Sequence, residues 1–391
     1  MRPAVAILAV AVLGAGCVQG PILAVPPAER PTSVPAPTLP ARPPDPIEIV
    51  LPRDDGPHRR LTEWWYYTGH LRSVDGGRWG FELVVFRAER GLFPATWASH
   101  FAVTDEQAGT FRYGQRSEIG PQVDRSPRAA DGTPAGFDLA IAGGAAGVVA
   151  GQSPGPAGPA ASSGPPWTMA GAGGSDVLRA ELDNGTAIDL ELTSDRPAAL
   201  HDGDGWIDFG PAGSSYYYSR TRLTATGSIT AGGQTSEVTG LAWFDHQWGD
   251  FISVGGGGWD WFAINLEDGV DITLSLVRDR DGTYPLVYGT LVEADGSARH
   301  LDRDAFEVEV SGRWRSPETG IDYPAGWRVT LPSEGLVIDL EPSVADQELD
   351  TRATTAVVYW EGSQIVRAFR DGRRLEGEAY VELTGYGDGG G

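Results

Sequence analysis

The sequence predicts an all-β protein made of two lipocalin-like antiparallel β-barrel or sandwich domains packed together. Three observations lead to this prediction. Short strand-like segments recur over most of the chain, turns rich in Gly, Asp and Pro separate them, and no helical apolar periodicity runs longer than about two turns. With 391 residues, 41% of them hydrophobic, and 13 Trp, the chain is long and apolar enough for two packed cores.

The first 17 residues resemble a lipoprotein-type signal peptide. Arg2 gives a charged start, residues 4–14 form an apolar run too short to span a bilayer, and small residues lead to Cys17. Because Cys17 is the only cysteine, a disulfide within the chain is excluded. We expect lipidation of Cys17, with simple signal cleavage and an uncleaved anchor as the alternatives. All three place the domains outside the cytoplasm, at the cell surface or in the periplasm, and lipidation would attach them to a membrane.

A Pro-rich tether is expected over residues 18–57, because this composition favours a stiff, solvated chain. The N-terminal lipocalin-like domain is expected over 58–252 and opens with a Gly-rich hairpin. Residues 143–175 are of low complexity and predict a flexible surface insertion, with Trp167 as an anchor. The strands that we expect in this domain are 63–71, 79–89, 98–105, 187–193, 216–229 and 236–245.

The C-terminal lipocalin-like domain is expected over residues 256–388, after a Gly run at 253–258 that provides backbone freedom between the two parts. Barrels of this size close their edges and can leave a ligand cavity inside. The strands that we expect here are 259–266, 270–279, 284–296, 306–314, 326–332, 335–342, 356–366 and 377–386.

A polar step interrupts the aromatic strand "GLAWFDHQWGDF", residues 240–251. Strand alternation puts Phe244, His246 and Trp248 on one face and Asp245 on the other. Imidazole can pass protons near neutral pH, and a neighbouring carboxylate can orient it. The pattern therefore allows a functional His246–Asp245 pair. It equally allows a buried histidine satisfied by the backbone, with Asp245 capping the turn.

Two further acidic residues stand among aromatic residues. In "TEWWYYTG", Glu63, Trp65 and Tyr67 share one strand face, which indicates either a lined cavity or core packing beside a surface Glu. In "GWDWF", Asp260 lies before Trp261. A carboxyl in an apolar pocket stays protonated and can act as an acid, whereas one that points to solvent does not.

Composition excludes several classes of function. The formal charge of −23 argues against nucleic acid and against docking on anionic lipid. All 30 basic residues are Arg, so a lysine Schiff base is impossible. No phosphate-binding loop and no GxSxG motif occurs. We expect no cofactor and no metal, because thiolate pairs are absent and the other histidines lack metal-site spacing; they are His58, His70, His100, His201 and His300.

Ten segments in order resemble the AttH/CrtC-like proteins: "TEWWYYTGHL", "WGFELVVFR", "SHFAVTD", "YYYSRTRL", "GLAWFDHQWG", "GWDWF", "RWRSPETGIDYPAGW", "DQEL", "VYWEG" and "GEAYVELTGY". This family includes secreted lipocalin-like proteins, carotenoid 1,2-hydratases and, more distantly, fungal lipocalin-like Diels–Alderases. The resemblance runs from His58 to Tyr386 and implies two lipocalin-like domains with a ligand cavity in or between them. It also implies a role for His246 and Trp248, which match the His-x-Trp of the hydratase branch. The Tyr-x-Asp proton donor of that branch has no match here, and Asp260 is the nearest acid.

We therefore expect an extracytoplasmic protein that binds a hydrophobic small molecule, a lipid or an isoprenoid, in a cavity at or near the domain interface. The alternative is a hydratase-like enzyme that adds water to an alkene or cyclises it. In that case Asp260 or Glu63 is the acid, His246 positions water, and substitution of Asp260 by Asn abolishes turnover without unfolding. The residues that we expect to line the site are Trp65, Tyr67, Phe244, Trp248 and Trp261. A carbohydrate binder is a third hypothesis and rests on the Trp count alone.

Overall fold

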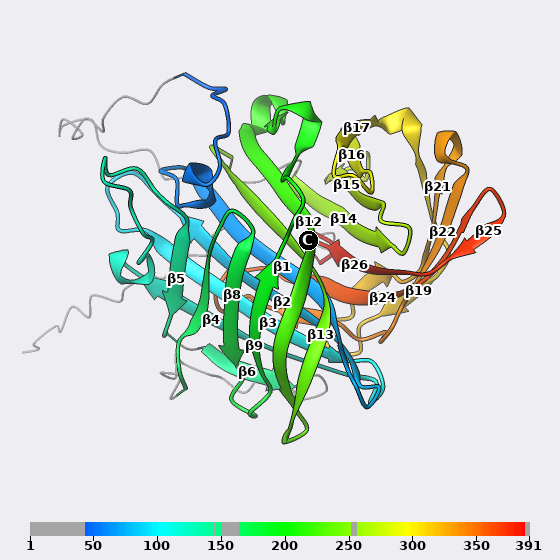
Figure 1. Cartoon of the computed structure of the whole chain (residues 1–391), viewed down its shortest axis with the longest axis horizontal. Helices are drawn as coiled ribbons and strands as arrows, with labels where there is room; N and C mark the ends of the chain where they lie inside the picture. Colours follow the sequence, from blue (N-terminus) through cyan, green and yellow to red (C-terminus); the bar gives the residue numbers. More distant parts are fainter. Residues whose placement is uncertain (1–43, 144, 150–163, 252–255, 388–391) are drawn as a thin grey trace, which may run out of the picture.

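The computed structural model describes residues 44–143, 145–149, 164–251 and 256–387. These residues form two large antiparallel sheets, the first from strands that end at Gly249 and the second from strands that begin at Gly256. The first sheet curls into a nearly closed barrel and the second into a half-barrel (Figure 1). The prediction of an all-β protein with two barrel-like parts is confirmed.

The first sheet is 13-stranded in the described part of the chain, with the order β5-β7-β8-β9-β12-β13-β1-β2-β3-β4-β6 and with β10 and β11 paired to β12. Its strands are β1 (Thr62–Ser73), β2 (Arg78–Ala88), β3 (Thr96–Asp105), β4 (Thr110–Ile119), β5 (Phe137–Ile141), β6 (Ala145–Val149), β7 (Trp167–Ala172), β8 (Ser175–Glu181), β9 (Ala187–Thr193), β10 (Ala199–Leu200), β11 (Trp206–Asp208), β12 (Ser214–Ala231) and β13 (Gln234–Gly249).

The second sheet has the order β17-β16-β15-β14-β26-β24-β22-β21-β18, with β23 and β25 paired to β24, and a two-stranded ribbon, β19-β20, stands beside it. The strands are β14 (Gly256–Leu266), β15 (Asp271–Asp279), β16 (Leu286–Val292), β17 (Ala298–Asp302), β18 (Glu307–Val310), β19 (Arg313–Arg315), β20 (Asp322–Pro324), β21 (Trp327–Leu331), β22 (Leu336–Pro342), β23 (Glu348–Asp350), β24 (Val358–Arg370), β25 (Arg373–Leu375) and β26 (Gly377–Leu383).

Helical structure among the described residues is limited to single 3₁₀ turns: η1 (Arg53–Asp55), η2 (Pro121–Val123), η3 (His201–Gly203), η4 (Gly210–Ala212), η5 (Arg303–Ala305) and η6 (Pro332–Glu334). Within the same residues, no helix combines the length and apolarity that crossing a membrane would require.

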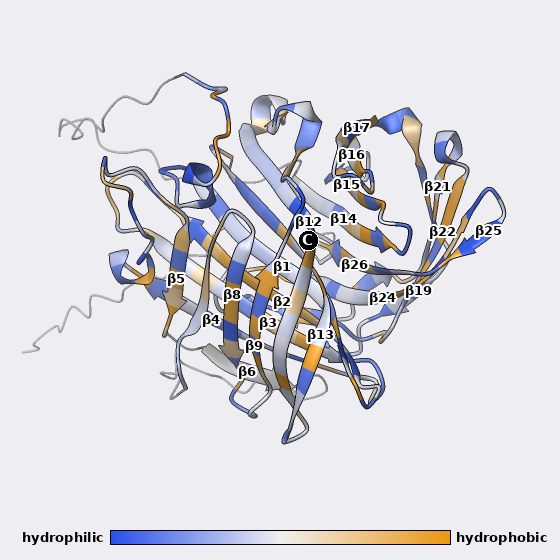
Figure 2. Cartoon of the chain, in the orientation of Figure 1, coloured by the Kyte–Doolittle hydropathy of each residue, from blue (hydrophilic) through white to orange (hydrophobic). Residues whose placement is uncertain are grey.

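Each strand of the barrel turns alternate residues inward, and Figure 2 shows apolar and polar residues alternating along these strands. The barrel core is rich in large rings, among them Trp65, Trp97, Phe101, Phe137 and Phe244. The second sheet has its own core around Phe262, Trp327 and Trp360. The two cores are separate, as two folding units would require.

The outer face of β1, β2 and β13 packs against the second sheet. This domain joint contains Tyr66 and Trp243 from the barrel and Trp261 and Tyr380 from the second sheet, all buried. As a result, β1 and β13 are covered on both faces, which explains their aromatic residues on both sides.

The structure corrects two of the segment assignments. Within residues 143–175, Trp167 is buried as expected for an anchor, but the segment is not simply a surface insertion, because β6 and β7 pair within the barrel; residues 150–163 lie outside the described part of the chain. The tether expected over 18–57 does not extend to residue 57, because residues 44–58 pack over one end of the barrel, with Ile49 and Leu51 against its core. Apolar residues spaced between prolines provide that contact. We call residues 44–58 the covering segment. Cys17 and the signal peptide lie outside the described residues.

Candidate acid–base centre

Strands β1 and β13 bring the predicted polar residues together inside the barrel. They pair antiparallel with Glu63 opposite Trp248 and Trp65 opposite His246. Side chains that lie opposite each other on one sheet face are neighbours. Glu63, Trp65, Tyr67, Phe244, His246 and Trp248 all belong to this inward-facing set, and all are buried. Alternation predicted that His246 and Asp245 lie on opposite faces of one strand, and the pairing with β1 shows that His246 lies on the same face as Glu63.

Glu63 joins two imidazoles. Its Oε1 atom lies 3.1 Å from Nε2 of His246 and 2.8 Å from Nδ1 of His58. The backbone N–H of His58 donates to Oε2 of Glu63 at 2.9 Å. The side chains of Glu63 and His246 are 0% exposed, so this is a fully buried, hydrogen-bonded carboxylate. His58 comes from the covering segment, and no spacing rule in the sequence links it to this site.

The environment separates the pKa values of the two histidines. Burial raises the pKa of Glu63, but hydrogen bonds from His246 and His58 outweigh it and bring the pKa to about 2. Burial lowers the pKa of His246. Burial also opposes the charged form of His58, but hydrogen bonds to Asp54 and Glu63 prevail and raise its pKa. At neutral pH, Glu63 is therefore ionised and His246 is neutral.

These contacts define the tautomer of His246. An ionised carboxylate only accepts hydrogen bonds, so Nε2 of His246 carries the proton that points to Glu63. Its Nδ1 atom is then unprotonated and lies 3.4 Å from the hydroxyl oxygen of Tyr218. That hydroxyl donates to Oδ1 of Asp55 at 2.5 Å. Nδ1 is thus the proton-accepting atom of the centre, oriented from the other side by Glu63.

Aromatic rings surround the centre. Trp65 stacks on His246 with 4.7 Å between ring centroids, and Trp248 stacks on His58 at 4.0 Å. Tyr67 and Phe244 stack at 4.5 Å one layer deeper. These rings contact one another, so this region is a packed core in the structure.

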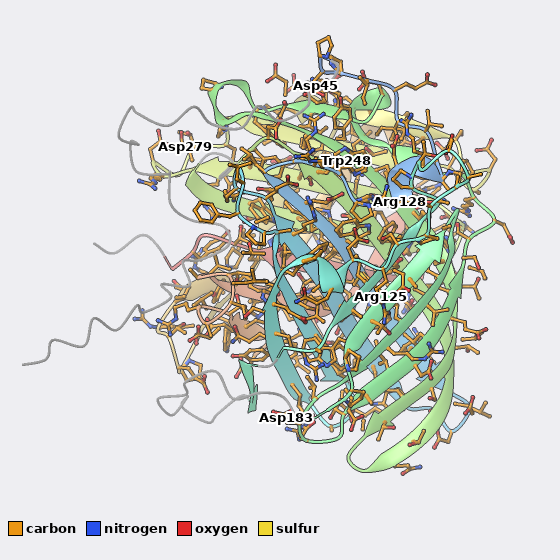
Figure 3. All side chains as sticks on the ribbon, turned by 90° about the vertical axis from the view of Figure 1, so that its left-hand side faces the viewer. Asp45, Arg125, Arg128, Asp183, Trp248 and Asp279 are labelled. Carbon is orange, nitrogen blue, oxygen red and sulfur yellow. The ribbon has the colours of Figure 1, made fainter. Side chains whose placement is uncertain are left out.

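The covering segment closes this end of the barrel. The indole N–H of Trp65 donates to the backbone oxygen of Asp55 at 3.0 Å, and the backbone N–H of Ile47 donates to the hydroxyl of Tyr216 at 2.8 Å. Figure 3 shows Trp248 on the same side of the barrel as Asp45 of this segment, with Asp183 at the opposite end. These contacts place the covering segment over the centre at this end of the barrel.

Asp176 on β8 is a second buried acid in the barrel, which the sequence did not reveal. The hydroxyl of Tyr67 donates to its Oδ2 atom at 2.9 Å. Burial raises the pKa of Asp176 to about 7, although the hydrogen bond from Tyr67 and the charge of Arg220 act in the opposite direction. Asp176 is therefore partly protonated near neutral pH. The β8 strand alternates regularly, but its single inward carboxyl carries no local motif.

His58, Glu63 and His246 also satisfy a geometric condition for metal ligation, since one donor atom from each lies within 4.8 Å of the others. In the structure these atoms hydrogen-bond one another, because both imidazoles contact the carboxylate of Glu63. The expectation that no metal is required stays a prediction, and the assay below tests it.

Asp260 lies elsewhere, in the second sheet. It is buried beside the core of the half-barrel, where Arg278 donates to its Oδ1 atom at 3.0 Å and Tyr386 donates at 2.9 Å. Burial raises the pKa of Asp260 to about 6, although Arg278 and Tyr386 lower it. The structure does not bring Asp260 together with His246, so its geometry gives no support to Asp260 as the acid of this centre.

Asp245 and Trp261 lie in the domain joint. Ser219, Tyr217 and Trp243 all donate to the carboxyl of Asp245, and the indole of Trp261 donates to the hydroxyl of Tyr217 at 3.1 Å. Burial raises the pKa of Asp245 to about 6. These contacts explain both residues as parts of the joint, on the opposite face of β13 from the acid–base centre.

The barrel also has a groove on its outer face, over β7, β8, β9 and β12. Charged side chains line it, including Arg125, Asp138, Arg179 and Asp189. Its position outside the sheet separates it from the inward-facing centre.

Comparisons with known proteins agree with this architecture. The structure resembles that of NE1406 from Nitrosomonas europaea, described as AttH, with a TM-score of 0.70 and 28% identity over 90% of this chain and 99% of that one. It resembles kievitone hydratase from Nectria haematococca with a TM-score of 0.63 and 16% identity, over 87% of this chain and 94% of that one. It resembles CghA with bound Sch210972 with a TM-score of 0.52 and 12% identity, over 83% and 89%. At these last two identities, the likeness is one of fold.

No curated protein sequence matches the chain. The family described as AttH-like matches residues 41–386, which include the covering segment and both sheets. The chain therefore belongs to the AttH-like family.

Proposed function

We propose that the protein is an acid–base enzyme that binds an apolar alkene inside the first barrel and adds water to it, or removes water from the product. The observation that carries this proposal is the state of His246. It is neutral, Glu63 orients it at Nε2, its Nδ1 atom is available to accept a proton, and aromatic rings surround it. A protein that only binds lipid would gain nothing from burying such a centre, because burial of ionised groups costs free energy.

The residues divide into an acid and a base. Pairs of buried groups whose environments push their pKa values apart are typical of such sites. Asp176 is the candidate acid, because its carboxyl is partly protonated near neutral pH. His246 is the candidate base, because its imidazole is neutral. Asp55 accepts a hydrogen bond from the hydroxyl of Tyr218, and its charge acts on His246. Polar contacts therefore connect Asp55 and Tyr218 to the centre.

In the addition, the π electrons of the alkene take the proton of the Asp176 carboxyl, so that a C–H bond forms and an O–H bond breaks. The oxygen of a water molecule then bonds to the carbocation and loses its extra proton to Nδ1 of His246. Return of that proton to Asp176 restores the starting state. The faces of Trp65 and Phe244 stabilise the cation through their π electrons.

One protein of the same fold is named for this class of reaction, namely kievitone hydratase. The enclosed aromatic wall favours an isoprenoid or similar apolar substrate, because burial of apolar surface would provide the binding energy.

The test is incorporation of deuterium from D2O into isoprenoid alkenes, with geraniol and squalene as probes and mass spectrometry as the readout. We expect the wild type to transfer deuterium and His246→Asn and Glu63→Gln to lose at least about 100-fold in rate, as is typical for removal of an acid or base. The matched control is His201→Asn, since His201 is equally buried but hydrogen-bonds Thr290 and Ser219 in the joint. Full activity of both centre variants would refute the proposal, and loss of activity after chelation would show that a metal is required.

We also propose that the protein works outside the cytoplasm, held at a membrane by a lipid on Cys17. The signal-like residues 1–17 support this location. Mass spectrometry of the mature protein from its host should find an acylated Cys17 at the amino terminus, and an unprocessed Met1 terminus in a cytosolic fraction would contradict it.

A further inference from the structure

We propose that Tyr218 and Asp55 are positioning residues, which hold a hydrogen-bond acceptor against His246 so that its Nδ1 atom can take up a proton. This inference rests on the proposed function for its purpose but not for its test. It assigns a role to the covering segment, which carries Asp55.

Asp55 is fixed in place from three directions. The hydroxyl of Tyr218 and the guanidinium of Arg220 donate to its Oδ1 atom at 2.5 and 3.2 Å, and the backbone N–H of Gly173 donates to Oδ2 at 2.7 Å. Asp55 is 1% exposed. Hydrogen bonds from these three donors hold the buried carboxyl in one orientation.

The direction of the Tyr218 hydrogen bond determines its effect on His246. Because its hydroxyl proton is committed to Asp55, the oxygen of Tyr218 presents only lone pairs to Nδ1 of His246, 3.4 Å away. With neutral His246, two lone pairs face each other, which gives a long and weak contact. When Nδ1 takes up a proton, the contact becomes a hydrogen bond to an oxygen that a carboxylate has polarised.

Both nitrogens of His246 are thus provided with acceptors, Glu63 at Nε2 and Tyr218 at Nδ1. This arrangement opposes the effect of burial among Trp65 and Trp248, which disfavours the imidazolium form. Sequence spacing could not suggest it, because Tyr218 comes from β12 and Asp55 from η1.

The chain has a matched control one residue away. Tyr217 is equally buried on the opposite face of β12, and its hydroxyl donates to Asp245 at 2.5 Å. Tyr217→Phe and Asp245→Asn therefore remove the same atoms as Tyr218→Phe and Asp55→Asn, but in the domain joint.

The experiment is a pH titration of the protein by NMR after nitrogen-15 labelling of its 6 histidines. In the wild type, the spectra should show His246 neutral with its proton on Nε2, and uptake of a proton at Nδ1 as the pH falls. Tyr218→Phe and Asp55→Asn should each lower the pKa of His246 by about one unit, the size expected for loss of one hydrogen bond to a charged group. Tyr217→Phe and Asp245→Asn should leave it unchanged.

An unchanged pKa of His246 in Tyr218→Phe would overturn the inference. Unfolding of the wild-type protein before Nδ1 of His246 is protonated would also overturn it. Tyr218→Phe removes one oxygen, so it decides the outcome even if Asp55→Asn fails to fold, which circular dichroism would report. No substrate is involved. A shifted pKa without any turnover would therefore refute only the proposed function, and turnover without a shift would refute only the positioning role.

Discussion

At the scale of single residues, strand alternation predicted which residues share a face within β1 and within β13, because period two is fixed by the backbone. It did not predict which face is the interior; the pairing of the two strands shows that Glu63 and His246 share the interior while Asp245 faces the joint. The alternation could not predict His58 or Asp55, which precede the first strand and reach the centre through the path of a loop. It also could not reveal that Asp260 has a cationic partner, because Arg278 is on the neighbouring strand β15.

The contact between Asp260 and Arg278 leads to a prediction that differs from the one made on the sequence alone. Asp260→Asn should retain turnover, because the residue lies apart from His246. It should not lower the free energy of unfolding at neutral pH, because burial, which raises the pKa of Asp260 to about 6, already disfavours its charged form in the folded protein. Urea denaturation and the deuterium assay would measure both. A folded variant without activity would restore Asp260 as the proton donor.

At the scale of elements, the long strands with strong alternation were predictable and the short or polar ones were not. Strand β12 was expected almost over its full length and β13 and β24 over most of theirs, since aromatic and β-branched residues mark them. Strand β4, "TFRYGQRSEI", was missed, because its many polar residues face the joint and the end of the barrel. The covering segment was predicted to be part of the tether, because its proline content dominated the prediction. The burial of Asp54 and Asp55 cannot be recognised from composition.

The domain joint contains three carboxyls that no cation neutralises within the described contacts; Glu82 and Glu361 are buried and Glu382 is half-buried. Tyr359 donates to Glu82 at 2.9 Å, Tyr66 to Glu361 at 2.8 Å, and Trp259 to Glu382 at 2.8 Å. Burial raises the pKa of Glu82 to about 8 and that of Glu382 to about 7, and it raises the pKa of Glu361 as well. The joint therefore favours the protonated form of these carboxyls.

This joint predicts the dependence of stability on pH. Groups whose pKa is higher in the folded state than in the unfolded chain stabilise the protein fully below the unfolded value, near 4.5, and lose this contribution as the pH rises to about 8. Glu82→Gln should thus raise the free energy of unfolding at about pH 9, on the order of a few kcal/mol, and change it little at about pH 5. Denaturation at the two pH values measures the effect. The control is Glu341→Gln, an exposed partner of Arg367, and equal effects of the two substitutions would contradict the account.

At the scale of the whole molecule, the sequence sufficed for an all-β fold with two barrel-like parts, and each sheet lies wholly on one side of residues 252–255. It did not suffice for the location of the site. Aromatic residues on both faces of β1 and β13 were compatible with a cavity in the barrel or between the domains. Only the three-dimensional contacts show that the inner face holds the Glu63–His246 pair and that the outer face packs against the second sheet, where Tyr66 donates to Glu361.

The central claim is that substrate reacts inside the first barrel, and a crystal structure of the protein soaked with geraniol tests it most directly. We predict that the covering segment shifts and that geraniol lies between Trp65 and Phe244, with its alkene carbons beside Nδ1 of His246. Geraniol bound in the domain joint or in the outer groove, with the rings of the barrel still packed against one another, would contradict the account.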